Sequence, residues 1–282
     1  MILSPVQRSY INSQLRCCKL ANLLLVLMTS TVLGSGTQPA TQCNVVLSRS
    51  KITSISVPSD IYGKPVAANV YLPPCYGTNA TSLYPVFYLL HGGGADQSQW
   101  LDLNVQTAAD ALIVQSQWPF IVVMPGDIYS GSINDVDFII NELRPAVEAQ
   151  FLVGSSRSYR GIAGLSLGGY LALQVAFLHP DLFAMVGGYS PVVNRPNPSD
   201  PLALMHRTVP PLLQSMPIEL DVGDQDSLAY DVRLFAQTGQ GRGLAITLTV
   251  GHGGHLRSYW RSRTADHLRF FLNALQSCTT CF

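Results

Sequence analysis

The segment Gly164–Gly169 (GLSLGG) constrains the fold of this chain more than any other. It follows a run of strand length, Tyr159–Ala163, and precedes Tyr170–Phe177, in which apolar residues recur at helical spacing. A glycine–x–serine–x–glycine sequence between a strand and a helix is typical of a sharp turn that strains the backbone of the serine. The flanking glycines leave room that side chains would fill. We therefore interpret Ser166 as a candidate nucleophile.

Two other regions carry matching motifs in a characteristic order. Upstream, the apolar run Pro85–Leu90 leads into His91–Gly94 (HGGG), a loop type that contributes a backbone N–H to an oxyanion hole. Downstream, acidic residues lie in and just after the apolar run Ile218–Val222, and a second run, Leu244–Val250, ends in Gly251–His255. Serine, acid and then histidine is the chain order of the α/β-hydrolase fold. Strands that alternate with helices predict a mostly parallel sheet covered on both faces.

At these residues the chain resembles the esterase D-like family of α/β-hydrolases. The resemblance is carried by Glu142–Glu148, Arg160–Gly169 and His179–Phe183, and it extends from about residue 50 to the C-terminus. That family includes feruloyl and acetyl-xylan esterases, S-formylglutathione hydrolases, enterochelin esterases and mycolyltransferases. The resemblance implies an α/β-hydrolase fold with a nucleophile elbow and a serine carboxylesterase activity.

The resemblance also implies which carboxylate belongs to the catalytic triad. Gly223–Leu228 is similar to the acid loop of the family, whose acid precedes a Ser-Leu pair, and this similarity selects Asp226. Two other acids, Asp221 and Asp224, lie in the same region and are alternatives. Asp226 itself can also act as a helix N-cap, because aspartate favours that position.

The histidine is selected in the same way. Gly253–Trp260 is similar to the histidine loop of the family and implies His255, with His252 as its competitor. We expect His91 to support its glycine loop, whose amides carry the function. The remaining histidines are expected at the surface or at helix ends: His179, His206 and His267.

These positions define a reaction scheme. A serine hydroxyl is a poor nucleophile without a base, so Ser166 requires His255 to take its proton, and Asp226 would hold that imidazole in the productive tautomer. The backbone N–H groups of Leu167 and Gly93 would form the oxyanion hole. This chemistry requires no metal and no organic cofactor.

Two tryptophans are candidates for substrate binding. Trp100 follows the glycine loop and Trp260 follows the histidine loop, so either can line a substrate pocket, although tryptophan is more often a core residue. Other side chains with the same two interpretations are Tyr129 and Tyr170. Two arginines can recognise a carboxylate but are expected at the surface: Arg160 and Arg195.

Composition fits a single enzyme domain. Of the 282 residues, 47% are hydrophobic, and 17 basic residues balance 17 acidic ones. A balanced charge without a basic tract argues against a nucleic-acid partner. We expect residues 37–282 to form one α/β-hydrolase domain whose partner is a small-molecule or polysaccharide-linked ester.

The first residues have the pattern of a targeting segment. No acidic residue precedes Asp60, and three basic residues precede the apolar run Leu20–Met28, after which small residues follow at 34–36. The run is short for a helix that crosses a bilayer, which needs about 20 apolar residues. We expect residues 1–36 to be a cleaved signal peptide and the protein to be secreted without stable membrane insertion. An uncleaved membrane anchor is the alternative.

Cysteine usage agrees with export. Removal of the leader leaves Cys43, Cys75, Cys278 and Cys281, and an even number in an oxidising compartment favours disulfides. Four cysteines allow three pairings, among which the sequence does not choose.

These observations lead to one expected function with two alternatives. We expect a secreted serine carboxylesterase that hydrolyses a small acyl or aromatic ester, such as those that decorate plant polysaccharide, through an acyl-enzyme. An acyltransferase of the mycolyltransferase type would use the same triad, whereas a binding protein on this fold would usually lack a triad member. The identity of the ester depends on the loops 95–105, 126–134 and 191–215, and the oligomeric state is not determined by the sequence.

Overall fold

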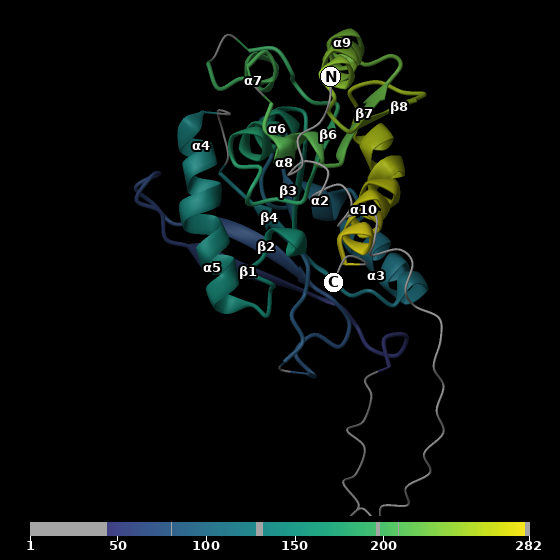
Figure 1. The fold of residues 1–282 in the computed structure, drawn as a ribbon. Coiled ribbons are helices and arrows are strands. Elements are labelled where there is room, and N and C mark those ends of the chain that lie inside the picture. The colour runs from purple at the N-terminus through teal and green to yellow at the C-terminus, as the bar shows by residue number, and fades with distance from the viewer. Residues whose placement is uncertain (1–43, 80, 128–131, 196–197, 208, 280–282) are drawn as a thin grey trace, which may run out of the picture. The chain divides into compact units, whose positions relative to one another are not determined.

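A twisted sheet of eight strands organises the described part of the chain, in the order β1-β2-β4-β3-β5-β6-β7-β8 (Figure 1). Strands β1 and β2 are antiparallel, β2 is antiparallel to β4, and all pairs from β4 to β8 are parallel. The strands are β1 (Lys51–Val57), β2 (Val66–Leu72), β3 (Val86–Leu90), β4 (Ile121–Pro125), β5 (Arg160–Leu165), β6 (Met185–Tyr189), β7 (Ile218–Gly223) and β8 (Ile246–Gly251). The central strands are buried along their whole length, as expected for a parallel sheet covered on both faces.

The computed structural model describes residues 44–79, 81–127, 132–195, 198–207 and 209–279, and Cys43–Thr279 form one compact unit. The expected leader, Cys43, Tyr129 and Cys281 lie outside the described residues, as does the side chain of Cys278. Within the described ranges, no helix combines the length and the apolar character that a membrane span requires.

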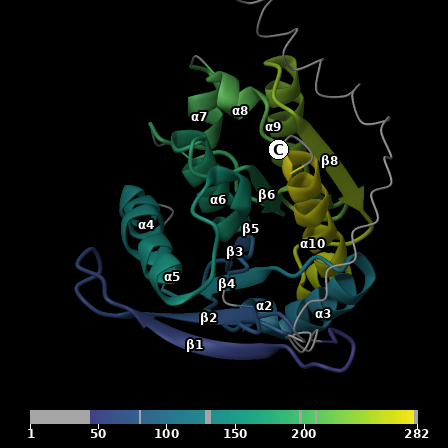
Figure 2. The ribbon, with the colours of Figure 1, turned by 60° about the horizontal axis from the view of Figure 1, so that its bottom comes forward.

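Helices cover both faces of the sheet (Figure 2). Alternate side chains of β3 enter two separate cores: Val86, Tyr88 and Leu90 join the core that includes α6, whereas Phe87 and Leu89 join the core that includes α3 and α10. The helices are α2 (Gln99–Asp102), α3 (Val105–Ser116), α4 (Ile133–Asp137), the π-helix η1 (Phe138–Leu143), α5 (Arg144–Gln150), the short 3-10 helix η2 (Arg157–Tyr159), α6 (Leu167–Leu178), α7 (Pro201–Met205), α8 (Pro211–Gln214), α9 (Ala229–Gly241) and α10 (Arg257–Thr279). The predicted α/β-hydrolase architecture is confirmed.

Two expected surface residues are buried instead. Arg160 is 3% exposed because its guanidinium donates to Glu148, at 2.6 Å, and to the carbonyl oxygen of Leu182, at 2.9 Å. His267 is 1% exposed, and its ring stacks on Tyr189 with 3.4 Å between ring centroids. Arg160 lies on β5 and His267 on α10, and packing of the sheet and its helices decides which side of each element faces the core. Residue type alone does not indicate that side.

Candidate active site

The nucleophile elbow joins the end of β5 to the start of α6. Ser166 has φ 52° and ψ −112°, in the positive-φ region that non-glycine residues rarely adopt. Its N–H donates to the carbonyl oxygen of Tyr189 at 2.8 Å, and its carbonyl oxygen accepts the N–H of Val192 at 3.2 Å. The segment around Tyr189 and Val192 therefore holds the strained serine in place, with its hydroxyl beyond the carboxyl end of β5.

The two glycines that flank this serine are required by close contacts of the backbone. A Cβ atom on Gly164 would lie 2.3 Å from the backbone of Gly168, and one on Gly168 would lie 2.3 Å from the carbonyl oxygen of His91. Real Cβ contacts are not that short, so neither position accepts a side chain without displacement of the backbone. The glycines of the motif thus bring the elbow and the HGGG loop together.

Three residues from distant parts of the sequence form a hydrogen-bonded series at this edge of the sheet. Nε2 of His255 lies 3.0 Å from Oγ of Ser166, and Nδ1 of His255 lies 2.9 Å from Oδ2 of Asp226. The residues are separated by 89 and 29 positions in the sequence. This geometry is the one that general-base activation of a serine requires.

Burial differs along the series. The side chain of Asp226 is fully buried, and its second carboxylate oxygen accepts the N–H of Leu228 at 2.9 Å. The His255 side chain is one-third exposed, and its ring meets the edge of Trp260 with 4.8 Å between ring centroids. The carboxylate is therefore immobilised, while the imidazole stays accessible to a substrate.

The HGGG loop lies directly over the elbow. A Cβ built on Gly92 would be 3.6 Å from Cβ of Ser166, and one built on Gly93 would be 3.7 Å from Cδ2 of Leu167. Among the described residues, the N–H groups of Gly93 and Leu167 donate to no other group. The structure therefore places the two expected oxyanion donors next to each other and beside the nucleophile.

The competing residues have other partners. His252 and Asp224 pair with each other at 3.1 Å at the surface, and the hydrogen bond from the N–H of Gly253 helps to lower the pKa of Asp224. Burial acts to raise the pKa of Asp221, but its contacts with His267, Tyr259 and Arg263 lower it overall. The contacts of Asp221 with Tyr259 and Arg263 fasten the first turns of α10 to β7.

The two tryptophans differ from the expectation in different ways. Trp100 is 1% exposed, and its indole N–H donates to the carbonyl oxygen of Leu90 at 3.1 Å, so it is a core residue and does not line the substrate pocket. Trp260 is 9% exposed, and its N–H donates to Ser190 at 3.0 Å. Trp260 also packs against the ring of His255 in a T-shaped arrangement, and its small exposed fraction leaves little surface for contact with a substrate.

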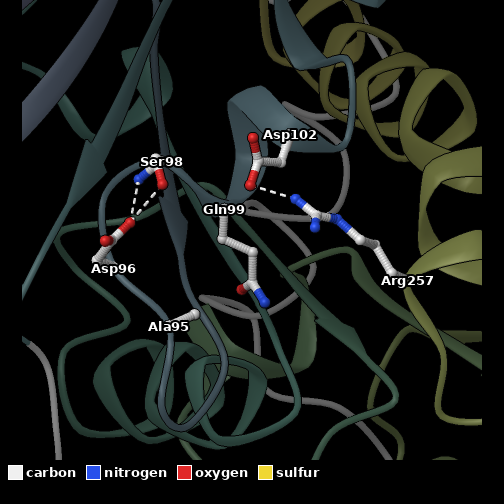
Figure 3. A pocket seen from close by; sticks show the side chains of 6 residues that line it. All are labelled: Ala95, Asp96, Ser98, Gln99, Asp102 and Arg257. Atoms are coloured by element: carbon white, nitrogen blue, oxygen red, sulfur yellow. Dashed lines mark hydrogen bonds and ion pairs between the residues drawn. The ribbon is translucent and has the colours of Figure 1, made fainter.

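A cavity of about 270 Å³ opens between the HGGG loop, α2 and the start of α10 (Figure 3). It is lined by Ala95, Asp96, Ser98, Gln99, Asp102 and Arg257. Asp102 and Arg257 form an ion pair across it. The lining is polar and contains no aromatic ring. Gln99 connects this cavity to the oxyanion loop, since its side-chain oxygen accepts the N–H of Gly92 at 2.7 Å. All of these residues except Arg257 lie in the segment 95–105, which was expected to influence the choice of ester, but no motif selects their individual side chains.

Within the described ranges, no group of three or more histidine, cysteine, aspartate or glutamate side chains is arranged to hold a metal ion.

Curated relatives share part of this chain. A xylanase/feruloyl esterase of Xylanibacter ruminicola is 32% identical over 156 residues, which are 50% of this chain and 22% of that protein. An esterase of Mycobacterium tuberculosis is 34% identical over 137 residues, which are 43% of this chain and 28% of that protein. The chain thus spans about a quarter of the length of these relatives.

Solved structures share the fold over most of the chain. A ferulic acid esterase superimposes with a TM-score of 0.76 at 25% identity and covers 81% of this chain and 99% of its own. An S-formylglutathione hydrolase of Staphylococcus aureus superimposes with a TM-score of 0.67 at 21% identity, over 79% of this chain and 96% of its own. The family model described as "Putative esterase" matches residues 59–271. The chain therefore belongs to this esterase family and has the α/β-hydrolase fold.

Proposed function

We propose that this chain is an exported serine carboxylesterase that hydrolyses esters of small or aromatic acids through an acyl-enzyme. The observation that carries the proposal is the continuous series from Asp226 through His255 to Ser166, with contacts of 2.9 and 3.0 Å. Membership of the esterase family supports the reaction class.

The proposed reaction has two half-reactions. His255 takes the proton of Ser166 while Oγ forms a bond to the ester carbonyl carbon, and the carbonyl electron pair moves onto its oxygen. Collapse of this tetrahedral intermediate expels the alkoxide, which receives the proton from His255. Water then attacks the acyl-serine by the same sequence and releases the acid. Asp226 stabilises the imidazolium that forms in each half-reaction.

The N–H groups of Gly93 and Leu167 would receive the oxyanion. Both donors belong to backbone that other contacts hold in place, so they need little reorganisation when charge develops. Loss of one such donor typically costs about 3 kcal/mol of barrier.

Esters of aromatic acids on plant polysaccharide are the proposed substrates. Support comes from the relative named as a xylanase/feruloyl esterase and from the similar structure named as a ferulic acid esterase. The cavity that follows the HGGG loop also supports an ester with a hydroxyl-bearing group, because its amide, carboxylate and guanidinium groups can bind hydroxyls.

Export and disulfide formation are parts of the same proposal. The basic and then apolar pattern of residues 1–36 supports a signal peptide. Support for a disulfide comes from the four cysteines that remain after removal of the leader, because an even number in an oxidising compartment favours disulfides.

The test is a comparison of hydrolysis rates on p-nitrophenyl acetate, p-nitrophenyl butyrate, methyl ferulate and acetylated xylan, with wild type and Ser166→Ala. The proposal expects turnover of at least one ester by wild type and none by the variant. Transfer of the acyl group to an added alcohol at a higher rate than hydrolysis would favour the acyltransferase. Absence of turnover, combined with equal glycan binding by both proteins, would favour a binding protein.

A further inference from the structure

We propose that Gln99 is a positioning residue for the oxyanion hole: its side-chain amide oxygen holds the peptide between His91 and Gly92 and thereby helps to aim the Gly93 N–H. This inference rests on the proposed function, because it assigns a role within the same reaction. Gln99 belongs to none of the motifs that the sequence carries, and it does not touch the triad.

The contact itself is short and partly buried. The Gly92 N–H donates to Oε1 of Gln99 at 2.7 Å, and Gly92 is buried beside the elbow. A backbone N–H that is buried without an acceptor is destabilising. Within the described residues, Gln99 supplies the acceptor that Gly92 requires.

The next peptide along the chain is held from the other side. Nδ1 of His91 lies 2.8 Å from the carbonyl oxygen of Gly92, which belongs to the same planar peptide as the N–H of Gly93. Gln99 holds the peptide plane before the Cα of Gly92, and His91 holds the plane after it. A glycine is otherwise free to rotate between such planes. The two contacts together set the direction in which the Gly93 N–H points.

Helix α2 gives Gln99 a fixed base. The neighbouring Trp100 donates to the carbonyl oxygen of Leu90 at 3.1 Å, which fastens α2 to the end of β3. At its other end, Asp102 pairs with Arg257 (Figure 3), and its carbonyl oxygen accepts from Arg261 at 2.7 Å. Gln99 is thus anchored both to the sheet and to the helix that follows the histidine loop.

The neutral amide suits this place. An amide oxygen accepts the Gly92 N–H without adding a full charge, whereas a carboxylate there would repel the negative charge that develops on the ester oxygen. We therefore expect Gln99 to stabilise the transition state, in which the oxyanion forms, more than it strengthens substrate binding.

The test compares Gln99→Met, which keeps the length of the side chain and removes the acceptor, with the matched control Gln97→Met in the same loop. With p-nitrophenyl acetate, Gln99→Met should lower kcat about 10- to 100-fold and change KM less than about 3-fold. Its affinity for a trifluoromethyl ketone, which forms an oxyanion adduct, should fall with kcat/KM. Gln97→Met should match wild type in all three measurements, and all proteins should melt within a few degrees of one another.

A second variant separates position from charge. Gln99→Glu keeps an acceptor, so its rate relative to wild type should be about one half at pH 4.5, where a carboxyl of ordinary pKa is about half protonated. The ratio should fall at least 10-fold by pH 8 as the carboxylate forms beside the developing oxyanion.

Three outcomes overturn the inference: kcat of Gln99→Met within 2-fold of wild type, an equal loss in Gln97→Met, or a pH-independent ratio for Gln99→Glu. Failure of the proposed function has a different signature, namely a wild type that hydrolyses no ester and whose Ser166 is not labelled by a fluorophosphonate. Labelling of Ser166 in wild type together with a fully active Gln99→Met would reject the role of Gln99 alone.

Discussion

The loops after β7 and β8 contain two histidine–aspartate pairs that look alike and lie in different environments. Asp226 meets His255 at 2.9 Å, and Asp224 meets His252 at 3.1 Å. The Asp226 and His255 side chains are 0% and 33% exposed, whereas those of Asp224 and His252 are 45% and 81% exposed. Of these two histidines, only His255 also forms a hydrogen bond with a third side chain, that of Ser166. A hydrogen-bond distance between histidine and aspartate therefore does not identify a catalytic pair.

The difference lies in what fixes each partner. Asp226 is enclosed and accepts a second hydrogen bond from backbone, so its carboxylate can hold an imidazole in one orientation. The Asp224 carboxylate accepts the Gly253 N–H at 3.0 Å and serves the turn in which His252 lies. Water competes for a pair so exposed, and its contribution to stability is small. The buried pair is therefore the one suited to the proposed reaction, whereas the exposed pair holds a turn in its loop.

Removal of each imidazole in turn should distinguish the two pairs most strongly. His255→Ala should lower kcat on the order of 10⁵- to 10⁶-fold, because the base that activates Ser166 is lost, whereas His252→Ala should stay within about 2-fold of wild type. Steady-state hydrolysis of p-nitrophenyl acetate measures both. Equal losses in the two variants would show that the exposed pair also takes part in the reaction.

The carboxylates provide the next test. Asp226→Asn should lower kcat about 10⁴-fold, since the amide can favour the wrong imidazole tautomer while the fold is kept. Asp224→Asn, which makes the same chemical change two residues away, should have little effect on kcat. A smaller loss in Asp226→Asn than in Asp224→Asn would exchange the roles of the two acids.

A third carboxyl, which forms no ion pair within the described residues, shows a pKa that burial dominates. Burial raises the pKa of Glu219 on β7 to about 8, from an ordinary value of 4.5. Between these values the folded protein keeps a proton that the unfolded chain releases, so rising pH lowers the free energy of unfolding through this window. The Glu219→Gln variant removes the titration. Its stability relative to wild type should rise by a few kcal/mol, as an order of magnitude, from about pH 5 to pH 8.

Urea denaturation at several pH values measures this effect, with Asp181→Asn at an exposed turn as the control. The control should follow wild type at every pH. A constant difference between Glu219→Gln and wild type would mean that Glu219 has the same pKa in the folded and unfolded states.

The smallest expected effect concerns the exposed pair itself. Asp224→Ala should leave the melting temperature within about 2 °C of wild type at neutral pH, because solvent screens an exposed ion pair. Differential scanning calorimetry at low and high salt checks this prediction. A drop of more than about 5 °C would indicate that the pair anchors the histidine loop.

The residues of the elbow were predictable because their chemistry is local. Ser166 needs a sharp turn and Gly164 needs the absence of a side chain, and both requirements appear in adjacent letters of the sequence. Asp226 and His255 were selected by resemblance to a family, since nothing in their immediate neighbourhood separates them from Asp224 and His252. The structure places the first pair beside Ser166 and leaves the second pair at the surface.

Other features depended on contacts between distant segments. Trp100 looked like a pocket residue from its position after the glycine loop, yet its indole lies in the core and its neighbour Gln99 lies against the loop. His267 looked like a surface residue, yet it stacks on Tyr189 from another element. Whether a helical side chain is buried depends on which face of the helix packs against the sheet. The sequence alone does not specify that face.

The sequence by itself determined the α/β architecture and pointed to Ser166 as the candidate nucleophile, because apolar periodicity and glycine spacing act between residues that are close in the chain. The tertiary structure decided which imidazole reaches Ser166, which carboxylate is shielded from water, and which amide oxygen accepts the Gly92 N–H. These outcomes depend on distances of about 3 Å between segments far apart in sequence, and only packing of the whole sheet and its helices sets such distances.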